Sequence, residues 1–255
     1  MKIIVLMKQV GNKDAILRIN RDETWIEEGD LSFEVNESDG YALEEALRLK
    51  EKKGGEVVVC SLGPQRAKSV IKDALARGAD RAIHIVTDAP VQAGPFAAAK
   101  ALAEAIRGEQ ADLVLTGLQS DDHGYGQTGV ILAELLGLPH ATIVIEVDAS
   151  GEEFRVKREL ESGWYQWYTM PLPALLTIQS GISQIRYATL KGIMAAKKKE
   201  IREVQPAGEA AEQFQRITKV YFPLKTKQTQ FLGDGDAKAG AAQLAEKLRN
   251  EARVI

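Results

Sequence analysis

The stretch that decides the fold is Asp112-Leu113-Val114-Leu115-Thr116-Gly117, which runs on into Leu118-Gln119-Ser120-Asp121-Asp122-His123-Gly124-Tyr125-Gly126-Gln127-Thr128-Gly129. Its first six residues contain the apolar run Leu113-Val114-Leu115, typical of a strand that is covered on both faces. A glycine-rich loop leaves this strand and enters a predicted helix over residues 127–136, which ends at Gly137. Strand, loop and helix in this order make one unit of an α/β fold.

The same alternation precedes this unit. Strands are predicted over 2–8, 56–61 and 81–86, and helices over 36–53, 65–77 and 96–107. Ser38 or Asp39 is a candidate cap of the first helix, and Gly54 a candidate stop. We therefore expect a three-layer, doubly wound, mostly parallel sheet of the Rossmann-like, adenine-nucleotide-binding type, with ligands beyond the carboxyl ends of its strands.

The chain changes character after residue 140. Four short strand-like segments, separated by turn residues, predict antiparallel hairpins added to the sheet: 141–147, 154–160, 164–169 and 172–178. Beyond Glu200 the pattern loosens, and only residues 237–252 predict an amphipathic helix. We expect an α/β domain over 1–204 and an extended C-terminal arm over 205–255.

Composition excludes several classes of protein. The chain has 255 residues, of which 45% are hydrophobic and 27% charged, with a net charge of −3; a nucleic-acid-binding surface is not expected. No segment approaches the ~20 apolar residues that span a bilayer, and the N-terminus predicts a strand rather than a signal peptide, so we expect a cytoplasmic protein without membrane insertion. Cys60 is the single cysteine, which excludes an intramolecular disulfide and predicts a buried thiol.

The glycine-rich loop is a candidate phosphate site, because backbone N–H groups and the helix dipole meet there. Gly124, Gly126 and Gly129 allow close backbone approach, Gln127 and Thr128 could donate to an anion, and Asp121 or Asp122 could accept from a ribose or an adenine. A glycine-rich turn with local caps is the alternative. The loop matches no P-loop, and no Gly-x-Gly-x-x-Gly follows the first strand, which disfavours hydride-transfer dehydrogenases. The three histidines have no metal-site spacing, and no hydrolase triad is apparent.

A second informative stretch is Arg186-Tyr187-Ala188-Thr189-Leu190-Lys191-Gly192-Ile193-Met194-Ala195-Ala196-Lys197-Lys198-Lys199-Glu200. Its few apolar side chains lie among small and basic residues. Such a segment can present an apolar anchor to a partner protein, with cations beside it that steer the encounter. The alternative is an ordinary amphipathic turn whose leucine belongs to the core.

The residue sequences of these two stretches resemble those of the electron transfer flavoprotein beta subunit. Arg-Tyr-Ala-Thr-Leu, then Ile-Met and Lys-Lys-Lys, is similar to the recognition loop of that family, here over 182–200. Its AMP loop is usually spelled Gln-Ala-Ile-Asp-x-x-x-x-Gln-Thr-Gly, which Asp122, Gln127, Thr128 and Gly129 match. The resemblance covers residues 1 to about 203.

The resemblance implies two cofactors. A redox-active FAD would be shared with an alpha subunit, with Lys13 and Asp14 near the flavin, and a structural AMP would occupy the loop. A second FAD in a bifurcating, NADH-using protein is the alternative. Thr128 favours AMP, because bifurcating members often have valine there, whereas Gly126 replaces a common asparagine and His123-Gly124-Tyr125 departs from the family. The implied cofactor residues are Leu6, Asn36, Asp39, Leu62, Gly117, Gln119, Asp122, Gly124, Gly126, Gln127 and Thr128.

The resemblance also implies partners. The alpha subunit would complete a heterodimer, an acyl-CoA-type dehydrogenase of fatty acid oxidation would supply electrons, and a quinone-linked acceptor would take them. The implied partner-binding residues are Leu190, Lys191, Ile193, Met194 and Lys198, with Leu190 as the anchor. The chain would be an electron carrier subunit, not an enzyme alone. A stand-alone adenine-nucleotide-binding regulatory protein is the remaining alternative.

Overall fold

A computed structural model describes residues 1–255 except 89–93, 152, 207–214 and 225–226. The described chain forms two compact units, Met1–Val220 and Tyr221–Ile255. Each unit is described by itself.

The first unit is built on a nine-stranded sheet in the order β11-β5-β4-β1-β6-β10-β7-β8-β9. All neighbours from β11 to β7 are parallel, and β8 and β9 continue the sheet antiparallel. The expected α/β class is therefore confirmed. The strands are β1 (Lys2–Leu6), β4 (Glu56–Gly63), β5 (Arg81–Val86), β6 (Leu113–Gly117), β7 (His140–Asp148), β8 (Arg155–Glu159), β9 (Tyr165–Thr169), β10 (Ala174–Ile178) and β11 (Ile201–Val204).

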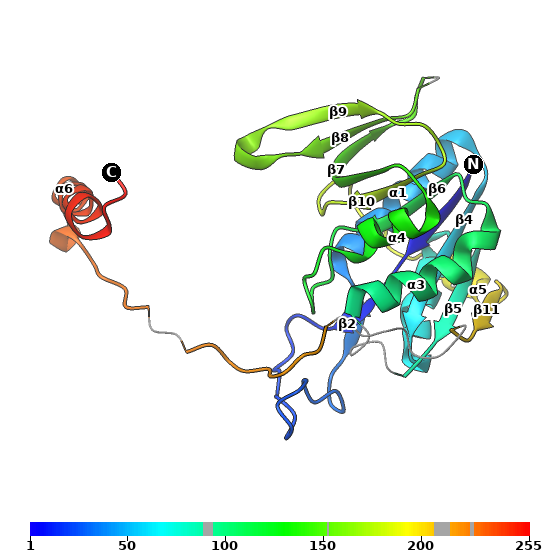
Figure 1. The fold of residues 1–255 in the computed structure, drawn as a ribbon, viewed down its shortest axis with the longest axis horizontal. Helices are drawn as coiled ribbons and strands as arrows, with labels where there is room; N and C mark the ends of the chain where they lie inside the picture. The colour runs from blue at the N-terminus through cyan, green and yellow to red at the C-terminus, as the bar shows by residue number, and fades with distance from the viewer. Residues whose placement is uncertain (89–93, 152, 207–214, 225–226) are drawn as a thin grey trace. The chain divides into compact units, whose positions relative to one another are not determined.

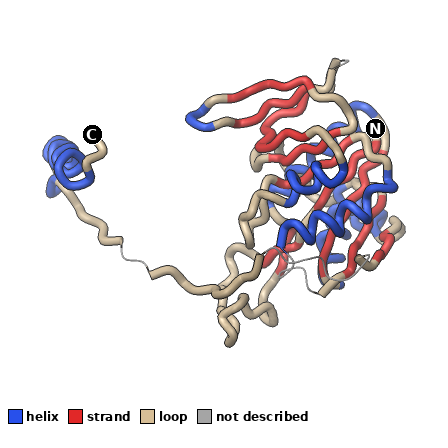
Figure 2. Tube along the Cα trace, viewed as in Figure 1, coloured by secondary structure: helices blue, strands red, loops and turns tan. Residues whose placement is uncertain are grey.

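Helices cover both faces of this sheet (Figures 1 and 2). The α-helices of the first unit are α1 (Glu37–Lys53), α2 (Lys68–Arg77), α3 (Gly94–Ile106), α4 (Thr128–Leu136) and α5 (Leu190–Ala196), with 3₁₀ turns at Gln65–Ala67, Arg107–Glu109 and Glu161–Gly163. Alternate residues of β1 explain the two layers. Ile3 packs in the core beneath α1 and α2, and Ile4 packs in the core beneath α3 and α4. Gly54 ends α1, as expected, at φ +73°.

The prediction that 172–178 forms part of an antiparallel hairpin was wrong. The strand β10 lies parallel between β6 and β7, with Ala174 paired to Leu113. All five of its residues are buried, which fits a central parallel strand covered on both faces. The short spacing to its neighbours suggested a hairpin, but burial on both faces decided the pairing.

Three further features differ from the sequence analysis. The strand β11 extends the sheet beyond β5 where a loosening chain was expected. The strand β7 begins at His140, just before the strand predicted over 141–147. The short strands β2 (Gln9–Gly11) and β3 (Phe33–Val35) pair antiparallel and bracket an excursion over residues 12–32, which we call the N-terminal excursion.

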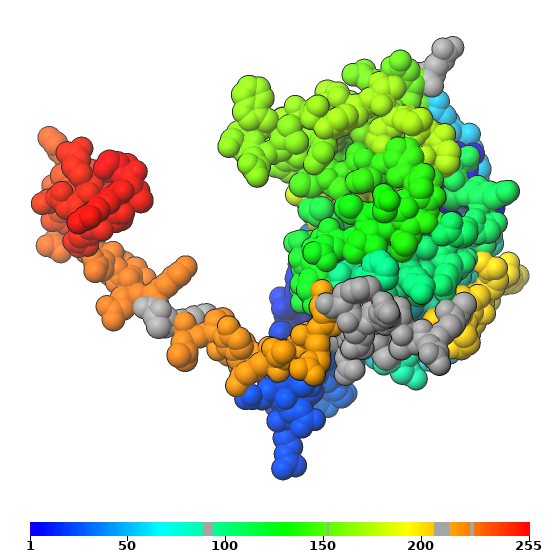
Figure 3. All heavy atoms as spheres, in the orientation of Figure 1, coloured from blue at the N-terminus to red at the C-terminus, as the bar shows by residue number. Residues whose placement is uncertain are grey.

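The end of the sheet projects from the first unit. The strands β8 and β9 form a lobe in the space-filling view (Figure 3), and four of the five residues of β9 are exposed. Trp164, Tyr165 and Trp167 are among its exposed aromatic side chains.

The second unit contains a 3₁₀ turn at Gly233–Gly235 and the helix α6 (Ala237–Lys247), which continues as a π turn over Leu248–Ala252. The helix expected over 237–252 is confirmed. Asp236 caps it by accepting from the Lys238 N–H at 2.9 Å. None of its residues is buried within the described chain.

Candidate functional site

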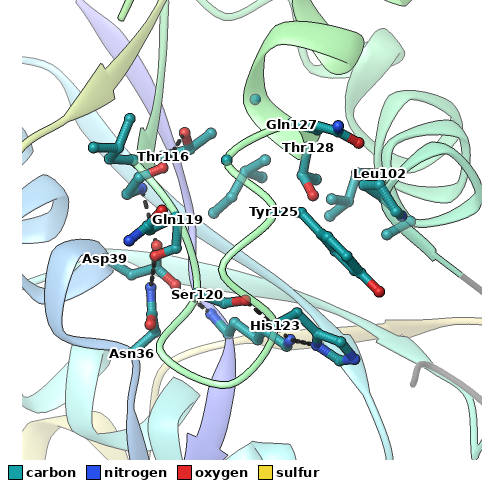
Figure 4. Close-up of a pocket in the computed structure, with 18 of the residues that line it drawn as sticks. Asn36, Asp39, Leu102, Thr116, Gln119, Ser120, His123, Tyr125, Gln127 and Thr128 are labelled. Carbon is teal, nitrogen blue, oxygen red and sulfur yellow. Dashed lines mark hydrogen bonds between the residues drawn. The ribbon is translucent and has the colours of Figure 1, made fainter. Parts of the chain in front are cut away.

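A cavity opens beyond the carboxyl ends of β1, β4 and β6, where the strand order reverses direction about β1. This is the position at which doubly wound sheets bind ligands. The empty space is about 900 Å³, including the part open to solvent, and small-molecule sites commonly have ~300–1,000 Å³. Leu6, Leu62 and Leu102 contribute to an apolar wall, and the loop that follows β6 supplies a polar one (Figure 4).

Most of the cofactor residues implied by the sequence line this cavity: Leu6, Asn36, Asp39, Leu62, Gly117, Gln119, Gly126, Gln127 and Thr128. Asp122 and Gly124 do not line it. The Gly124 N–H instead donates to the Ser120 carbonyl at 2.8 Å, with φ +63°, so this glycine closes a turn within the loop.

Asp39 joins the two central strands at the floor of the cavity. One carboxylate oxygen accepts from the Lys8 N–H at 2.7 Å, and the other accepts from the Gly117 N–H at 2.9 Å. Burial raises the pKa of Asp39 to about 7, although these hydrogen bonds and one from Asn36 act to lower it. A side chain at position 117 would meet Ser38 Oγ at 2.2 Å and Asp39 Oδ1 at 2.3 Å, which explains the glycine at the end of β6.

Asn36 and Ser38 hold the start of the loop against α1. The Asn36 amide donates to the Gln119 carbonyl at 2.9 Å, and its oxygen accepts from the Asp121 N–H at 2.9 Å. Ser38 Oγ donates to the same Gln119 carbonyl at 2.8 Å. The expectation that Ser38 or Asp39 caps α1 was therefore wrong: Asn36 is the N-cap residue, and both side chains bind the ends of the strands and the loop instead.

Lys8 holds the middle of the loop. Its ammonium lies 2.7 Å from Asp122 Oδ1 and 2.9 Å from His123 Nδ1. Burial acts to raise the pKa of Asp122, but hydrogen bonds to the carboxylate and the Lys8 charge outweigh it and hold that pKa well below its usual range. The Asp122 carboxylate therefore binds Lys8 instead of forming the cavity wall.

The sequence analysis missed an aromatic stack beside the cavity. The His123 ring lies between Trp25 and Tyr125, with centroid distances of 4.8 Å and 5.2 Å and interplanar angles of 19° and 22°. Both His123 and Tyr125 line the cavity, together with Lys8 and Ser120. Their position within the glycine-rich loop was a usable signal, whereas Trp25 comes from the N-terminal excursion, where no local pattern points to the loop.

The helix α4 begins at the cavity. Thr128 is its first residue, and Gln127 precedes it without a side-chain capping bond. A Cβ at Gly129 would lie 2.7 Å from Thr177 Cγ2 and 2.8 Å from Thr116 Oγ1. This glycine therefore allows the start of α4 to pack directly on β6 and β10, which brings the first N–H groups of the helix to the cavity.

The recognition loop is anchored to the domain while its apolar side chains stay exposed. Leu190, at the start of α5, is 77% exposed, and Ile193 and Met194 are also exposed; the alternative of a core leucine is wrong. Arg186 pairs with Glu44 at 2.9 Å and with Glu51 at 2.5 Å on α1.

The lysines of the recognition loop differ in their contacts. Lys191, Lys197 and Lys198 are exposed. The Lys199 ammonium instead donates to the carbonyls of Leu75 and Ala79 at the end of α2, and burial lowers its pKa. Lys199 therefore supports the loop and is not a free cation.

Other candidate groups are structural. Cys60 is fully buried, which raises its pKa to about 12. His84 is buried with Nε2 3.1 Å from the Gly63 carbonyl. Within the described residues, no group of histidine, cysteine or carboxylate side chains could hold a metal ion, and no described helix is long and apolar enough to cross a membrane.

Comparison with known proteins gives a consistent result. The model of the electron transfer flavoprotein domain matches residues 24–209. The chain is 36% identical to the electron transfer flavoprotein subunit beta of Methylophilus methylotrophus, over 91% of this chain and 93% of that protein. It is 37% identical to the subunit of the same name from Bradyrhizobium diazoefficiens over the whole of both chains, and 37% identical to the Homo sapiens subunit over 81% and 82% of the two chains.

Proposed function

The chain belongs to the electron transfer flavoprotein family, in which its full-length relatives are beta subunits, and on this premise we propose its cofactors and partners. It works as the electron-carrying beta half of a heterodimer in the cytoplasm and catalyses no reaction alone. The heterodimer accepts electrons from an acyl-CoA-type dehydrogenase and passes them to a quinone-linked acceptor. The cavity holds AMP.

The cavity itself is the observation that supports a bound nucleotide. An apolar wall that includes Leu6, Leu62 and Leu102 suits an adenine base. The uncapped N–H groups at the start of α4, with Gln127 and Thr128, suit a phosphate. The buried His123 Nε2, which has no hydrogen-bond partner within the described chain, is a further polar group that a ligand would satisfy.

A second FAD in place of AMP is the other candidate, and one observation favours it. Gly126 lines the cavity, and the atoms nearest to the position of a Cβ there, the Leu118 carbonyl oxygen and Gln119 Oε1, lie 3.9 Å and 4.0 Å away. The loop therefore leaves space for a ligand larger than AMP. Thr128, whose hydroxyl stands at the start of α4, favours the phosphate of AMP.

The N-terminal excursion is the proposed cover of the shared FAD. When bound, that cofactor supplies the redox chemistry. Ile16 and Leu17 are exposed beside Lys13 and Asp14, and apolar side chains next to a flavin exclude water from it. The cofactor contacts of this segment would be completed by the alpha subunit.

Exposed apolar side chains support an alpha subunit as partner. Tyr221, Phe222, Leu224 and Phe231 are each more than 60% exposed within this chain, an unusual state for a protein that works alone. We propose that the C-terminal arm, residues 205–255, packs on the alpha subunit over an obligate-type interface larger than ~2,000 Å².

The experiment is to co-express the chain with its alpha subunit, denature the purified complex and identify the released nucleotides by mass spectrometry. One FAD and one AMP per heterodimer are expected, because several charge-assisted hydrogen bonds of ~1.5–3 kcal/mol each retain a phosphate. Two FAD and no AMP would select the bifurcating alternative. A complex that releases no second nucleotide would contradict a nucleotide in the cavity.

A further inference from the structure

His123 carries a buried polar atom that the fold leaves unused. Its side chain is 9% exposed, it lines the cavity, and Nε2 has no hydrogen-bond partner within the described residues. The neighbouring polar ring does not share this state, because Trp25 Nε1 donates to Glu28 Oε1 at 3.2 Å. The unpaired atom therefore belongs to the middle ring of the stack, that of His123, which Figure 4 shows with Tyr125.

Lys8 decides which nitrogen of His123 holds the proton. An ammonium can only donate, and that of Lys8 lies 2.9 Å from Nδ1 while it also donates to Asp122 at 2.7 Å. The Asp122 carboxylate oxygen lies 3.2 Å from Nδ1, but the ammonium is closer. Nδ1 accepts from the ammonium, because an N–H at this position would face another donor and a full positive charge. This arrangement places the ring proton on Nε2.

A buried N–H donor without an acceptor destabilises the protein that contains it, unless a ligand or a water provides the acceptor. The ring cannot turn away easily, since Trp25 and Tyr125 stack on its two faces and Lys8 binds its other nitrogen. The donor is thus held in one orientation in the cavity wall before any ligand binds, which lowers the entropy lost on binding.

From this geometry we propose that His123 is a nucleotide-binding residue, donating from Nε2–H to an acceptor atom of the adenine nucleotide in the cavity. The inference rests on the proposed nucleotide function. It adds to that function a residue that the glycine-rich loop does not need for its turn. Lys8 acts as a positioning residue, because it sets the tautomer without itself supplying the donor.

Three variants of His123 in the full-length chain, co-expressed with the alpha subunit, separate donation from stacking. His123→Gln keeps an amide donor near Nε2 but loses the aromatic stack. His123→Phe keeps the stack but loses the donor. His123→Asn keeps neither, since its amide reaches only the position of Nδ1. Dissociation constants for AMP and for FAD are measured by equilibrium dialysis after nucleotide removal, and the tautomer is read from ring-nitrogen chemical shifts by NMR.

Donation predicts that His123→Phe and His123→Asn bind the retained nucleotide about tenfold or more weakly, as loss of one hydrogen bond implies, and that His123→Gln binds better than His123→Phe. The NMR spectrum should show the ring protonated at Nε2 and not at Nδ1. If His123→Phe binds like the unaltered chain, or better than His123→Gln, the ring only stacks and the inference is wrong. Failure of the nucleotide proposal looks different, because the unaltered chain would then bind neither AMP nor FAD.

Discussion

The contribution of individual loop residues to the stability of the protein depends on pH. Asp122 pairs with Lys8 and has a pKa held below its ordinary value of 3.8, although burial opposes the shift. A lowered pKa in the folded state means that the pair stabilises the protein above about pH 4 and that this stabilisation is lost as the pH falls further. Asp122→Asn should therefore lower the free energy of unfolding by about 1–3 kcal/mol at pH 7.

The measurement is urea denaturation of the two proteins between neutral and acid pH. The difference in unfolding free energy should shrink as the pH falls below 4, because unfolded Asp122 then binds a proton that the folded state resists until a lower pH. A difference that stays constant down to pH 2 would mean that Asp122 stabilises the loop by packing and not by its charge.

Leu190 offers a test of the recognition loop at the same scale. As an exposed anchor it should fill a pocket on the dehydrogenase, so Leu190→Ala should slow dehydrogenase-to-flavin electron transfer by about tenfold or more. Flavin content and thermal stability should stay unchanged, since 77% of the residue is already exposed. Leu172→Ala, a truncation of a partly exposed leucine elsewhere, is the control. Equal transfer rates for both variants would remove Leu190 from the proposed docking surface.

At the scale of elements, the position of α5 depends on one close approach. A Cβ at Gly192 would lie 2.2 Å from the Ala76 carbonyl oxygen, which is rigid backbone. Gly192→Ala should therefore displace α5 from α2, increase hydrogen exchange over 189–196 and weaken dehydrogenase docking, with a stability cost of about 1–3 kcal/mol. Gly108→Ala, where no atom lies within 4 Å, is the matched control and should change none of these. Unaltered exchange in the Gly192 variant would mean that α5 is not held by this contact.

Strands and helices were predictable from the sequence where an apolar run or a terminal glycine marked them. The strand β5 is apolar at four of its six positions, and glycines mark the ends of α1, α2 and α4. The strand β11 was missed because two of its four residues are exposed and charged, as an edge position permits. The cavity residues near the glycines were found from the sequence. The contact of His123 with Trp25 was not, because it joins segments far apart in the chain and no sequence pattern marks it.

At the scale of the whole molecule, the two units differ in what stabilises them. Met1–Val220 contains the complete sheet and both hydrophobic clusters, so it has a core of its own. No residue of α6 in Tyr221–Ile255 is buried, and aromatic side chains of that unit are exposed. Helices this short are marginal in water without a packed face. The second unit therefore needs a partner surface, whereas the first does not.

This difference predicts the result of a truncation. A chain that ends at Val220 should fold with nearly the thermal stability of the full-length protein, but it should no longer co-purify with the alpha subunit or retain FAD. The full-length double variant Tyr221→Ser and Phe231→Ser is the finer test, because it keeps the chain length and removes two exposed aromatic side chains. It should weaken the heterodimer by at least tenfold if these side chains are anchors of an obligate interface. A truncated chain that still co-purifies with a full complement of FAD would assign the interface to the first unit, where the exposed aromatic side chains of Trp164, Tyr165 and Trp167 would be the next candidates.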